Sequence, residues 1–317
     1  MTALHPPIEA RERVRQVVAE RGLAEQSPAR SFAWLVGAPA GWFGAYFAAN
    51  AIGHWATWVA AWTFQGLLTL SAVAGQHEAI HRNLFRSRWA NHVAGQIWGT
   101  FVLFPYGLYR TGHLQHHVAT HREGDTEPLE LYTGLRQYLL LTPLSGPMFL
   151  VMNFWAALKT MVGRPPTHIR TPQQRRIANM STALLLGTLT SVALLLRHDP
   201  GILVRAWLAP FVIGSLIVAT VTLPEHYLCR LGDGTAFETT RTIVSNPVIR
   251  FFFWGTNFHT AHHLVAGVPA HKLRVLHNDL AGTYDHVESG YIKWHLRLAC
   301  QLATDPAGQL TSSNHGG

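Results

Sequence analysis

The chain has 317 residues, of which 48% are hydrophobic and only 13% are charged. This composition fits a membrane protein with a sizeable polar part better than a soluble enzyme. The formal charge of +8 comes without a basic stripe or a nucleic-acid-binding motif, so nucleic acid is not an expected partner. The two cysteines, Cys229 and Cys300, exclude a disulfide framework and a cysteine-rich metal cluster.

The first apolar segments lie near the N-terminus. Residues 1–30 form a polar segment with helical spacing, and two long apolar stretches follow at 31–52 and 55–75. Each has the roughly 20 residues that a helix needs to cross a bilayer. Only Gly53 and His54 join them, so a tight pair of helices is expected.

Two histidine clusters come next. His77 and His81 stand in GQHEAIHR, directly after the second stretch, and a shorter apolar stretch at 93–108 leads into GHLQHHVATH. This second cluster contains His113, His116 and His117. Residues three and four positions apart share one face of a helix, so the spacing brings these imidazoles together.

The stretch 139–162 is long enough to cross, but Pro143, Gly146 and Pro147 are expected to break it. Arginine and lysine side chains also occur on both of its sides. Because cations gather on the cytoplasmic face, both ends are expected on that face. The sequence therefore predicts that this stretch lies in the membrane interface or re-enters.

Two further spans are predicted at 178–196 and 202–223, joined by 197–201. His226 follows the second of them in LPEHYL, and the third cluster, NFHTAHHL, contains His259, His262 and His263. Among 25 basic residues only Arg197 and Arg205 fall near the far face. All three clusters are therefore expected on the cytoplasmic side.

The C-terminal part is polar. Residues 229–246 are expected to form a loop or a short helix, and 290–303 are amphipathic and pack against the cytoplasmic part or the membrane surface. Residues 304–317 are expected to be a flexible tail. The predicted fold is all-α: an integral membrane domain at 31–303 with four transmembrane helices in two hairpins and a cytoplasmic helical cap that carries the histidines.

Eight clustered imidazoles need a cation to be close together at neutral pH. Imidazole is a borderline ligand that suits iron, zinc, copper and nickel, and this ring count suits two ions better than one. His226 is a ninth candidate. His121 is left open between a ligand and a supporting residue, and Asn257 is a candidate to hold a metal-bound water. The acidic residues expected to orient ligating rings by accepting their second N–H are Glu78, Asp125 and Glu225.

The motifs HEAIH, HLQHH and HTAHH, with the intervening EH, resemble the three histidine boxes of the membrane fatty acid desaturase superfamily. The resemblance covers about residues 31–280. It implies a non-haem diiron centre that uses dioxygen, with these ligands: His77, His81, His113, His116, His117, His226, His259, His262 and His263. It also implies removal of hydrogen from an unactivated C–H bond. The sequence has no recognisable haem, flavin or iron–sulfur motif, so electrons are expected from an external donor such as ferredoxin.

The function expected first is a desaturase that inserts a C=C bond into a fatty-acyl or lipid-like chain. The alternative is a hydroxylase or ketolase of the same superfamily, or a desaturase of a small amino-acid-derived metabolite. A metal transporter or sensor is disfavoured because the spans carry few polar residues, chiefly Gln65 and Arg205. A zinc hydrolase needs only three protein ligands, and nine candidates are too many for it.

Overall fold

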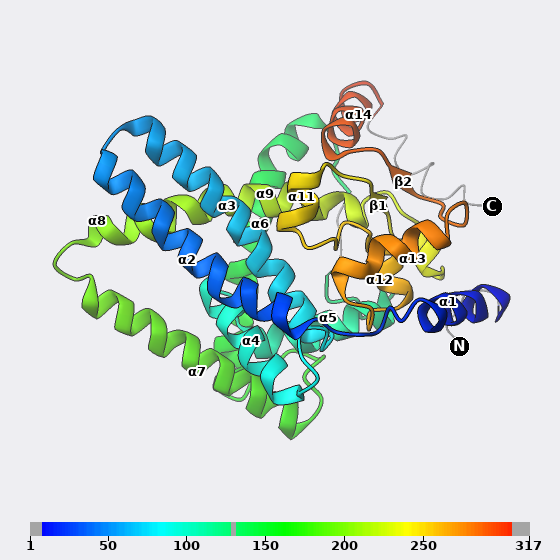
Figure 1. Cartoon of the computed structure of the whole chain (residues 1–317), viewed down its shortest axis with the longest axis horizontal. Coiled ribbons are helices and arrows are strands. Elements are labelled where there is room, and N and C mark those ends of the chain that lie inside the picture. Colours follow the sequence, from blue (N-terminus) through cyan, green and yellow to red (C-terminus); the bar gives the residue numbers. More distant parts are fainter. Residues whose placement is uncertain (1–7, 128–130, 306–317) are drawn as a thin grey trace. The chain divides into compact units, whose positions relative to one another are not determined.

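The structure is a computed structural model that describes residues 8–127 and 131–305. These residues, drawn in Figure 1, divide into two compact units. Of the described residues, unit 1 comprises 8–26, 113–127, 131–143 and 219–305, and unit 2 comprises 27–112 and 144–218. The described residues are mostly helical, as predicted, and their strands are two of two residues each.

Unit 2 holds the long apolar helices. Three of its helices pass into unit 1: α5 after Gly112, α6 before Leu144 and α9 after Val218. The elements of unit 2, including these three in full, are α2 (Pro28–Ile52), α3 (Trp55–Ile80), α4 (Arg88–Phe101), α5 (Tyr106–Ala119), α6 (Leu135–Met161), α7 (Pro172–Leu195), α8 (Pro200–Leu203), a π-helical stretch (Val204–Leu208) and α9 (Ala209–Thr222).

The join between α2 and α3 is the two-residue turn that the sequence predicts. Gly53 ends α2 with a left-handed φ of 72°, a conformation that glycine adopts at little steric cost. His54 then caps α3, because its Nδ1 accepts the backbone N–H of Ala56 at 3.2 Å. α2 and α3 therefore pack along one another, and Gln65 of α3 donates to the carbonyl of Trp42 in α2 at 3.0 Å.

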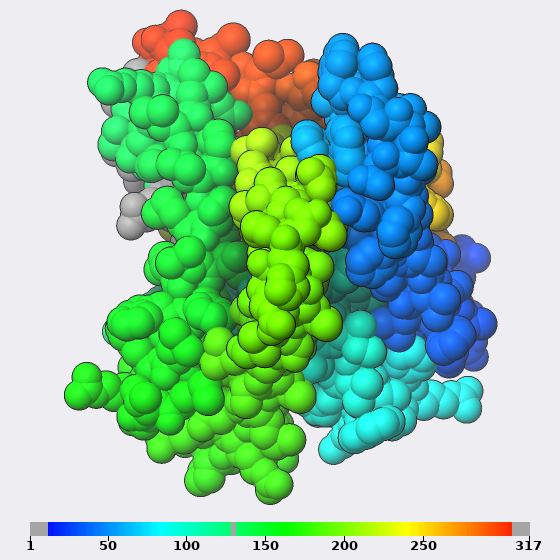
Figure 2. Space-filling model, turned by 90° about the vertical axis from the view of Figure 1, so that its left-hand side faces the viewer, coloured from blue at the N-terminus to red at the C-terminus, as the bar shows by residue number. Residues whose placement is uncertain are grey.

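The π-helical stretch is held by two indoles. The Nε1 of Trp42 donates to the carbonyl of Ala206 at 2.7 Å, and that of Trp62 donates to the carbonyl of Arg205 at 2.9 Å. A π-helical turn leaves carbonyls free of the regular helical ladder, so they accept bonds from neighbouring helices. In Figure 2 the yellow-green chain around these residues runs beside the blue α2.

Unit 1 holds shorter elements around an aromatic core. They are α1 (Ile8–Glu20), the 3₁₀ turn Leu223–Glu225, α10 (Ala236–Thr239), β1 (Thr242–Ile243), α11 (Pro247–Phe252), α12 (His259–Leu264), the 3₁₀ turn Ala270–Lys272, α13 (Leu273–Asp279), β2 (Val287–Glu288) and α14 (Tyr291–Thr304). β1 and β2 pair in parallel, with Thr242 opposite Val287. The core contains Tyr132, Tyr138, Leu223, Tyr227, Trp294, Leu298 and Leu302.

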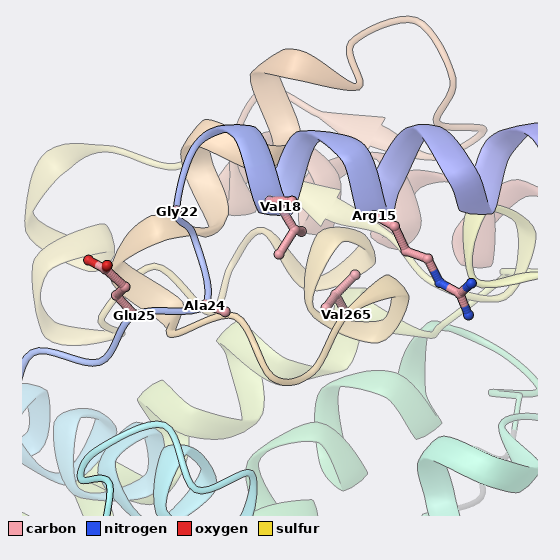
Figure 3. Close-up of a pocket in the computed structure, with 7 residues that line it drawn as sticks. Arg15, Val18, Gly22, Ala24, Glu25 and Val265 are labelled. Carbon is pink, nitrogen blue, oxygen red and sulfur yellow. The ribbon is translucent and has the colours of Figure 1, made fainter.

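Residues 8–26 of the polar N-terminal segment belong to unit 1. Arg21 pairs with Asp279 of α13 at 3.1 Å, and Lys272 donates to the carbonyl of Gly22 at 2.9 Å. α1 also forms one wall of a groove in which Val18 and Val265 face one another, with Arg15 and Glu25 at its ends (Figure 3). The remaining lining residues are Ala19, Gly22 and Ala24.

Three helical segments of the described chain are long and apolar enough to cross a membrane: Leu135–Met161, Pro172–Leu195 and Pro200–Glu225. The last two match predicted spans. The expected break at Pro143, Gly146 and Pro147 is wrong, because α6 runs unbroken through all three. Neighbouring structure compensates for proline inside membrane helices. α2 and α3 are long enough to cross a membrane but are not among these three segments. Both are rich in alanine, glycine, tryptophan and tyrosine, which are less hydrophobic than leucine and isoleucine.

The structure describes two of the three C-terminal segments that the sequence analysis distinguished. The polar region 229–246 contains the short helix α10 and the unpredicted strand β1. The amphipathic stretch 290–303 forms α14, whose buried side chains join the core of unit 1. Residues 306–317 of the expected tail lie outside the described residues.

Candidate metal centre

The second and third histidine clusters lie on helices of unit 1. α5 carries His113, His116 and His117 in its last turns, and the six-residue α12 carries His259, His262 and His263. The predicted helical spacing is therefore realised in both clusters. His226 stands at the end of the 3₁₀ turn Leu223–Glu225, directly after the apolar segment Pro200–Glu225.

Two groups of ring nitrogens form within unit 1. In the first, the Nε2 atoms of His113 and His117 lie 3.1 Å apart, and those of His117 and His262 also lie 3.1 Å apart. The second group joins His116, His226 and His263, whose ligand atoms lie within 4.8 Å of one another. Two helices that are far apart in sequence thus contribute to each group.

His226 connects the second group to the ring of His259. Its Nε2 lies 3.2 Å from Nε2 of His116 and 2.8 Å from Nε2 of His259. The ring of His263 stacks on that of His117 with centroids 4.1 Å apart, which links the two groups. Seven predicted ligands are therefore gathered in unit 1.

The second nitrogen of several rings is held by an oxygen. Nδ1 of His116 lies 2.7 Å from Oδ1 of Asp125, Nδ1 of His113 lies 2.9 Å from Oε1 of Glu127, and Nδ1 of His226 lies 3.1 Å from the carbonyl of Thr239. A carbonyl or a carboxylate only accepts, so each Nδ1 carries the proton. In the neutral rings Nε2 then bears the lone pair that binds a metal.

This arrangement fits a bound metal. Lone pairs that face each other at 3.2 Å, as on His116 and His226, repel unless a proton or a cation lies between them. Two nitrogens each bound at about 2.1 Å to one ion and 90° apart lie about 3.0 Å from one another. The Nε2 separations of 2.8–3.2 Å match that value. The all-imidazole donor set favours a first-row transition metal.

The electrostatics keep most of these rings neutral. Burial, reinforced by neighbouring histidines, holds the pKa values of His226, His259 and His263 well below the ordinary 6.5. For His116 burial lowers the pKa, but the carboxylates of Glu127 and Asp125 raise it by more. Neutral imidazole is the form that binds a metal, so these rings need not lose protons first.

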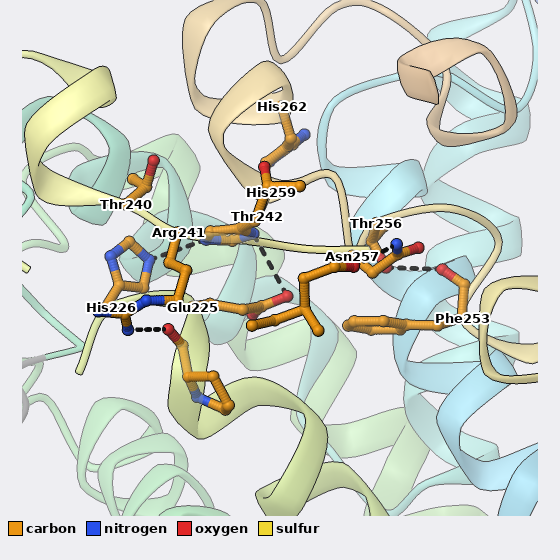
Figure 4. Close-up of polar contacts among 12 residues, drawn as sticks. Glu225, His226, Thr240, Arg241, Thr242, Phe253, Thr256, Asn257, His259 and His262 are labelled. Carbon is orange, nitrogen blue, oxygen red and sulfur yellow. Dashed lines mark hydrogen bonds and ion pairs between the residues drawn. The ribbon is translucent and has the colours of Figure 1, made fainter. Parts of the chain in front are cut away.

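A network of buried polar groups fixes the backbone around His226 (Figure 4). Nη1 of Arg241 donates to the carbonyls of Pro224 and Tyr227, at 2.7 and 2.5 Å, and its backbone N–H donates to the carbonyl of Glu225 at 2.7 Å. These bonds bracket His226 on both sides. The segment that supplies Thr239 for Nδ1 of His226 therefore also clamps the chain that carries it.

His77 and His81 lie in unit 2, at the end of α3. Their rings contact each other with centroids 4.9 Å apart. The carboxylate of Glu78 lies 3.8 Å from Nδ1 of His77 and accepts a hydrogen bond from the side chain of Asn83 at 3.3 Å. The first cluster thus forms a compact pair beside a buried acidic residue.

The other predicted residues are placed less centrally. His121 has a left-handed φ of 60°, and its Nδ1 donates to the carbonyl of Arg230 at 2.7 Å, so it belongs to neither nitrogen group. Asn257 is fully buried and donates to the carbonyl of Ile243 at 2.8 Å. Glu225 lies 3.5 Å from Nδ1 of His259, which is longer than an ordinary hydrogen bond.

The sequence profile of the fatty acid desaturase family matches residues 53–294, which is most of the chain. The chain belongs to the fatty acid desaturase family. It is therefore an oxidoreductase of the desaturase type, as the histidine boxes predict.

Several desaturases are similar to this chain at low identity. An sn-1 oleoyl-lipid 12-desaturase of Arthrospira platensis is 22% identical over 279 residues, which covers 81% of this chain and 76% of its own. One from a Synechocystis strain is 20% identical, covering 69% and 67%. The acyl-lipid omega-3 desaturase (cytochrome b5) of the Arabidopsis thaliana endoplasmic reticulum is 24% identical, covering 64% and 55%.

Two residues at the centre of this desaturase were not predicted. Glu127 holds His113, and its spacing of 14 residues gives no periodic signal. Arg241 clamps the segment around His226 from a polar stretch that was expected to be a loop. The sequence gives no hint of this role, because the acceptors of Arg241 are backbone carbonyls.

Proposed function

We propose that this desaturase uses dioxygen and a non-haem diiron centre to insert a C=C bond into a fatty-acyl or lipid-like chain. The observation that carries the proposal is the convergence of histidine Nε2 atoms around His226 and around His117. The Nδ1 atoms of His113, His116 and His226 are at the same time hydrogen-bonded to oxygens. The names of the relatives support a lipid substrate.

The proposed ligands are the nine histidines that the family resemblance indicates. His113, His117 and His262 would hold one iron, and His116, His226 and His263 the other, with His259 beside the second group. His77 and His81 would complete the set from the end of α3. Asp125, Glu127 and Glu225 would orient the rings, and Glu78 would do so for His77.

Bound iron would supply the capacity to activate dioxygen and remove hydrogen from an unactivated C–H bond. The balance requires an external donor: a CH₂–CH₂ unit, one dioxygen, two electrons and two protons give a CH=CH unit and two waters. The protein's own residues hold the rings in one tautomer, keep the imidazoles neutral and exclude water by burying His116, His226, His259 and His262.

The proposed topology has four spans, α2, α3, α7 and the segment Pro200–Glu225, with the metal centre on the cytoplasmic side. His116 precedes all three strongly apolar helices and His226 follows them, yet their Nε2 atoms lie 3.2 Å apart. Two residues on the same face of a membrane are separated by an even number of membrane crossings. At most two of the three strongly apolar helices therefore cross. α6 has cations near both ends, at Arg136 and Lys159, so we assign α6 to the membrane interface.

One-sided labelling tests this topology. In a Cys300→Ser background, cysteines introduced at Glu123, before α6, and at Gly163, after it, should react with a membrane-impermeant maleimide from the same side of sealed vesicles, and one at His198 from the opposite side. Reaction at Glu123 and Gly163 from opposite sides would contradict the assignment of α6.

The proposed electron donor is a small soluble or membrane-bound carrier such as ferredoxin. The excess of 25 basic over 17 acidic residues favours an acidic carrier through electrostatic steering. One relative is named with cytochrome b5, which is a second carrier to test.

The deciding experiment is turnover of the purified, iron-loaded protein with a reduced donor and ¹⁸O-labelled dioxygen. We expect about two irons per chain, an alkene in the acyl product and the label in water only. Label in an organic alcohol or ketone would establish the hydroxylase or ketolase reaction instead. Zinc alone after iron-rich expression, with no activity on iron reconstitution, would refute the diiron centre.

A further inference from the structure

α14 is an amphipathic helix whose outer face is apolar. Its inner face, Tyr291, Trp294, Leu298 and Leu302, is buried in unit 1. Its outer face presents Ile292, which is 79% exposed, and Leu296, which is 62% exposed. The exposed Cys300 continues the same row, because residues four apart lie on one side of a helix. A helix whose apolar side chains point outward as well as inward needs a second apolar surface to cover them.

The charged residues that α14 itself contributes beside this row are both positive. Lys293 and Arg297 stand one position after Ile292 and Leu296, and both are exposed. The sequence of 291–304 contains no aspartate or glutamate. Arg297 also pairs with Glu288 of β2 through its Nη2. A helix with an apolar row flanked by cations is typical of one that lies in the plane of an anionic membrane surface.

The inner face joins α14 to the ends of two strongly apolar helices. Nε2 of His295 donates to the carbonyl of Thr220 at 2.8 Å, and Thr220 lies five residues before the end of the segment Pro200–Glu225. Tyr138, in the first turns of α6, donates to Nδ1 of His295 at 2.6 Å. Figure 1 shows α14 beside the start of α6. α14 is therefore fixed beside the end of the proposed span Pro200–Glu225, where that span leaves the apolar layer, and beside the start of α6, which we assign to the membrane interface.

We propose that α14 lies in the membrane interface, with Ile292 and Leu296 in the acyl boundary and Lys293 and Arg297 at anionic lipid headgroups. The proposal rests on the proposed membrane crossing of Pro200–Glu225 and on no property of the metal centre. A protein partner fits less well, because one 14-residue helix with two large apolar side chains offers far less than the roughly 800 Å² per partner of a stable interface.

The native Cys300 provides the reporter. Cys229 is the other cysteine, and burial raises the pKa of its thiol to about 11, so a spin label should attach to Cys300 alone. In nanodiscs we expect the label to collide with oxygen, which concentrates in lipid, more than with a soluble nickel chelate. The matched control carries Glu12→Cys in a Cys300→Ser background, since Glu12 is an exposed residue of α1. Equal nickel access at both positions would overturn the proposal.

The cations provide the second test. The thermal midpoint of the wild type should be higher in nanodiscs with anionic lipid than in neutral ones, and Lys293→Gln with Arg297→Gln should abolish that difference. The control is Arg13→Gln on α1. Iron content should not change in either variant, which separates this test from that of the metal centre. If the double variant keeps the lipid-dependent difference but loses reduction by the donor, α14 is a donor-docking face and the proposal fails.

Discussion

Nδ1 of His116 lies 2.7 Å from Oδ1 of Asp125, and both side chains are buried. The bond fixes the ring so that its Nε2 faces His226. Burial raises the pKa of Asp125, but the hydrogen bond and charge of His116, together with the backbone N–H groups of Glu127 and His121, lower it by more, so the carboxylate stays ionised. Asp125 therefore provides both orientation and a compensating negative charge close to a cation.

Asp125→Asn should weaken metal binding by about 10- to 100-fold, because an amide supplies no charge and accepts a weaker bond. Competition with a chelator of known affinity measures this. Asp233→Asn is the matched control, since Asp233 is exposed and pairs only with Arg122 among the ion pairs of the described residues. Equal metal affinity in both variants would show that Asp125 does not support a ligand.

His116→Ala and His262→Ala remove one ring from each nitrogen group. Each should abolish desaturation and lower the iron content, measured by elemental analysis of the purified protein. His54→Ala should do neither, although it removes the cap of α3 and costs about 1 kcal/mol of helix stability. Full iron content in either cluster variant would remove that ring from the ligand set.

The sequence predicted the local features of this desaturase well. Helical spacing placed three rings of α5 on one face, and the pair Gly53–His54 predicted where α2 ends and α3 begins. These features depend on neighbours within four residues, which the sequence displays directly. The prediction at Pro143 failed because proline breaks a helix in water, whereas α6 continues through it.

The distant contacts of the site were beyond sequence reasoning. His116 and His226 are 110 positions apart, and only the folded chain brings their Nε2 atoms to 3.2 Å. Arg241 is similar, because its two acceptors are backbone carbonyls, which every residue possesses. No residue type in the sequence marks which carbonyl a buried guanidinium will find.

Arg241→Lys should loosen the segment around His226. Lysine lacks the planar fork that reaches the carbonyls of Pro224 and Tyr227 together, so one carbonyl loses its charged donor. We expect a loss of about 2–3 kcal/mol in unfolding free energy and a larger fractional loss of iron than in the control. The control is Arg230→Lys, whose arginine is partly exposed and pairs with Glu238. Equal iron content in the two variants would make Arg241 a purely structural residue.

Acid should destabilise the metal-free protein. Burial lowers the pKa values of His226, His259 and His263. In the native state these rings therefore bind protons less readily than an imidazole with the ordinary pKa of 6.5. The unfolded chain then takes up more protons as the pH falls, so their contribution is full above 6.5 and is lost progressively below it. The raised pKa of His116 has the opposite effect on stability, but it is one group against three whose pKa values are lowered. The denaturant concentration at the unfolding midpoint should decrease as the pH is lowered from about 7.5 to about 5.5. A midpoint that stayed constant over this range would contradict this account.

Gly214 of α9 lies where α9 meets α3. A Cβ at this position would lie 2.5 Å from the Cβ of Thr69, and at Gly66 it would lie 3.2 Å from the backbone nitrogen of Gly214. Small residues that let two backbones approach are a recurrent feature of helix pairs in membranes. Gly214→Ala should therefore push the helices apart and cost about 1–3 kcal/mol.

The matched control is Gly187→Ala in α7, where an added Cβ would meet nothing within 4 Å. Alanine favours a helix over glycine by up to about 1 kcal/mol, so the control should be neutral or slightly stabilising. Thermal unfolding in the same nanodiscs measures both. If Gly214→Ala matched Gly187→Ala, the contact between α3 and α9 would be loose enough to accept a methyl group, and this close approach would not contribute to the stability of unit 2.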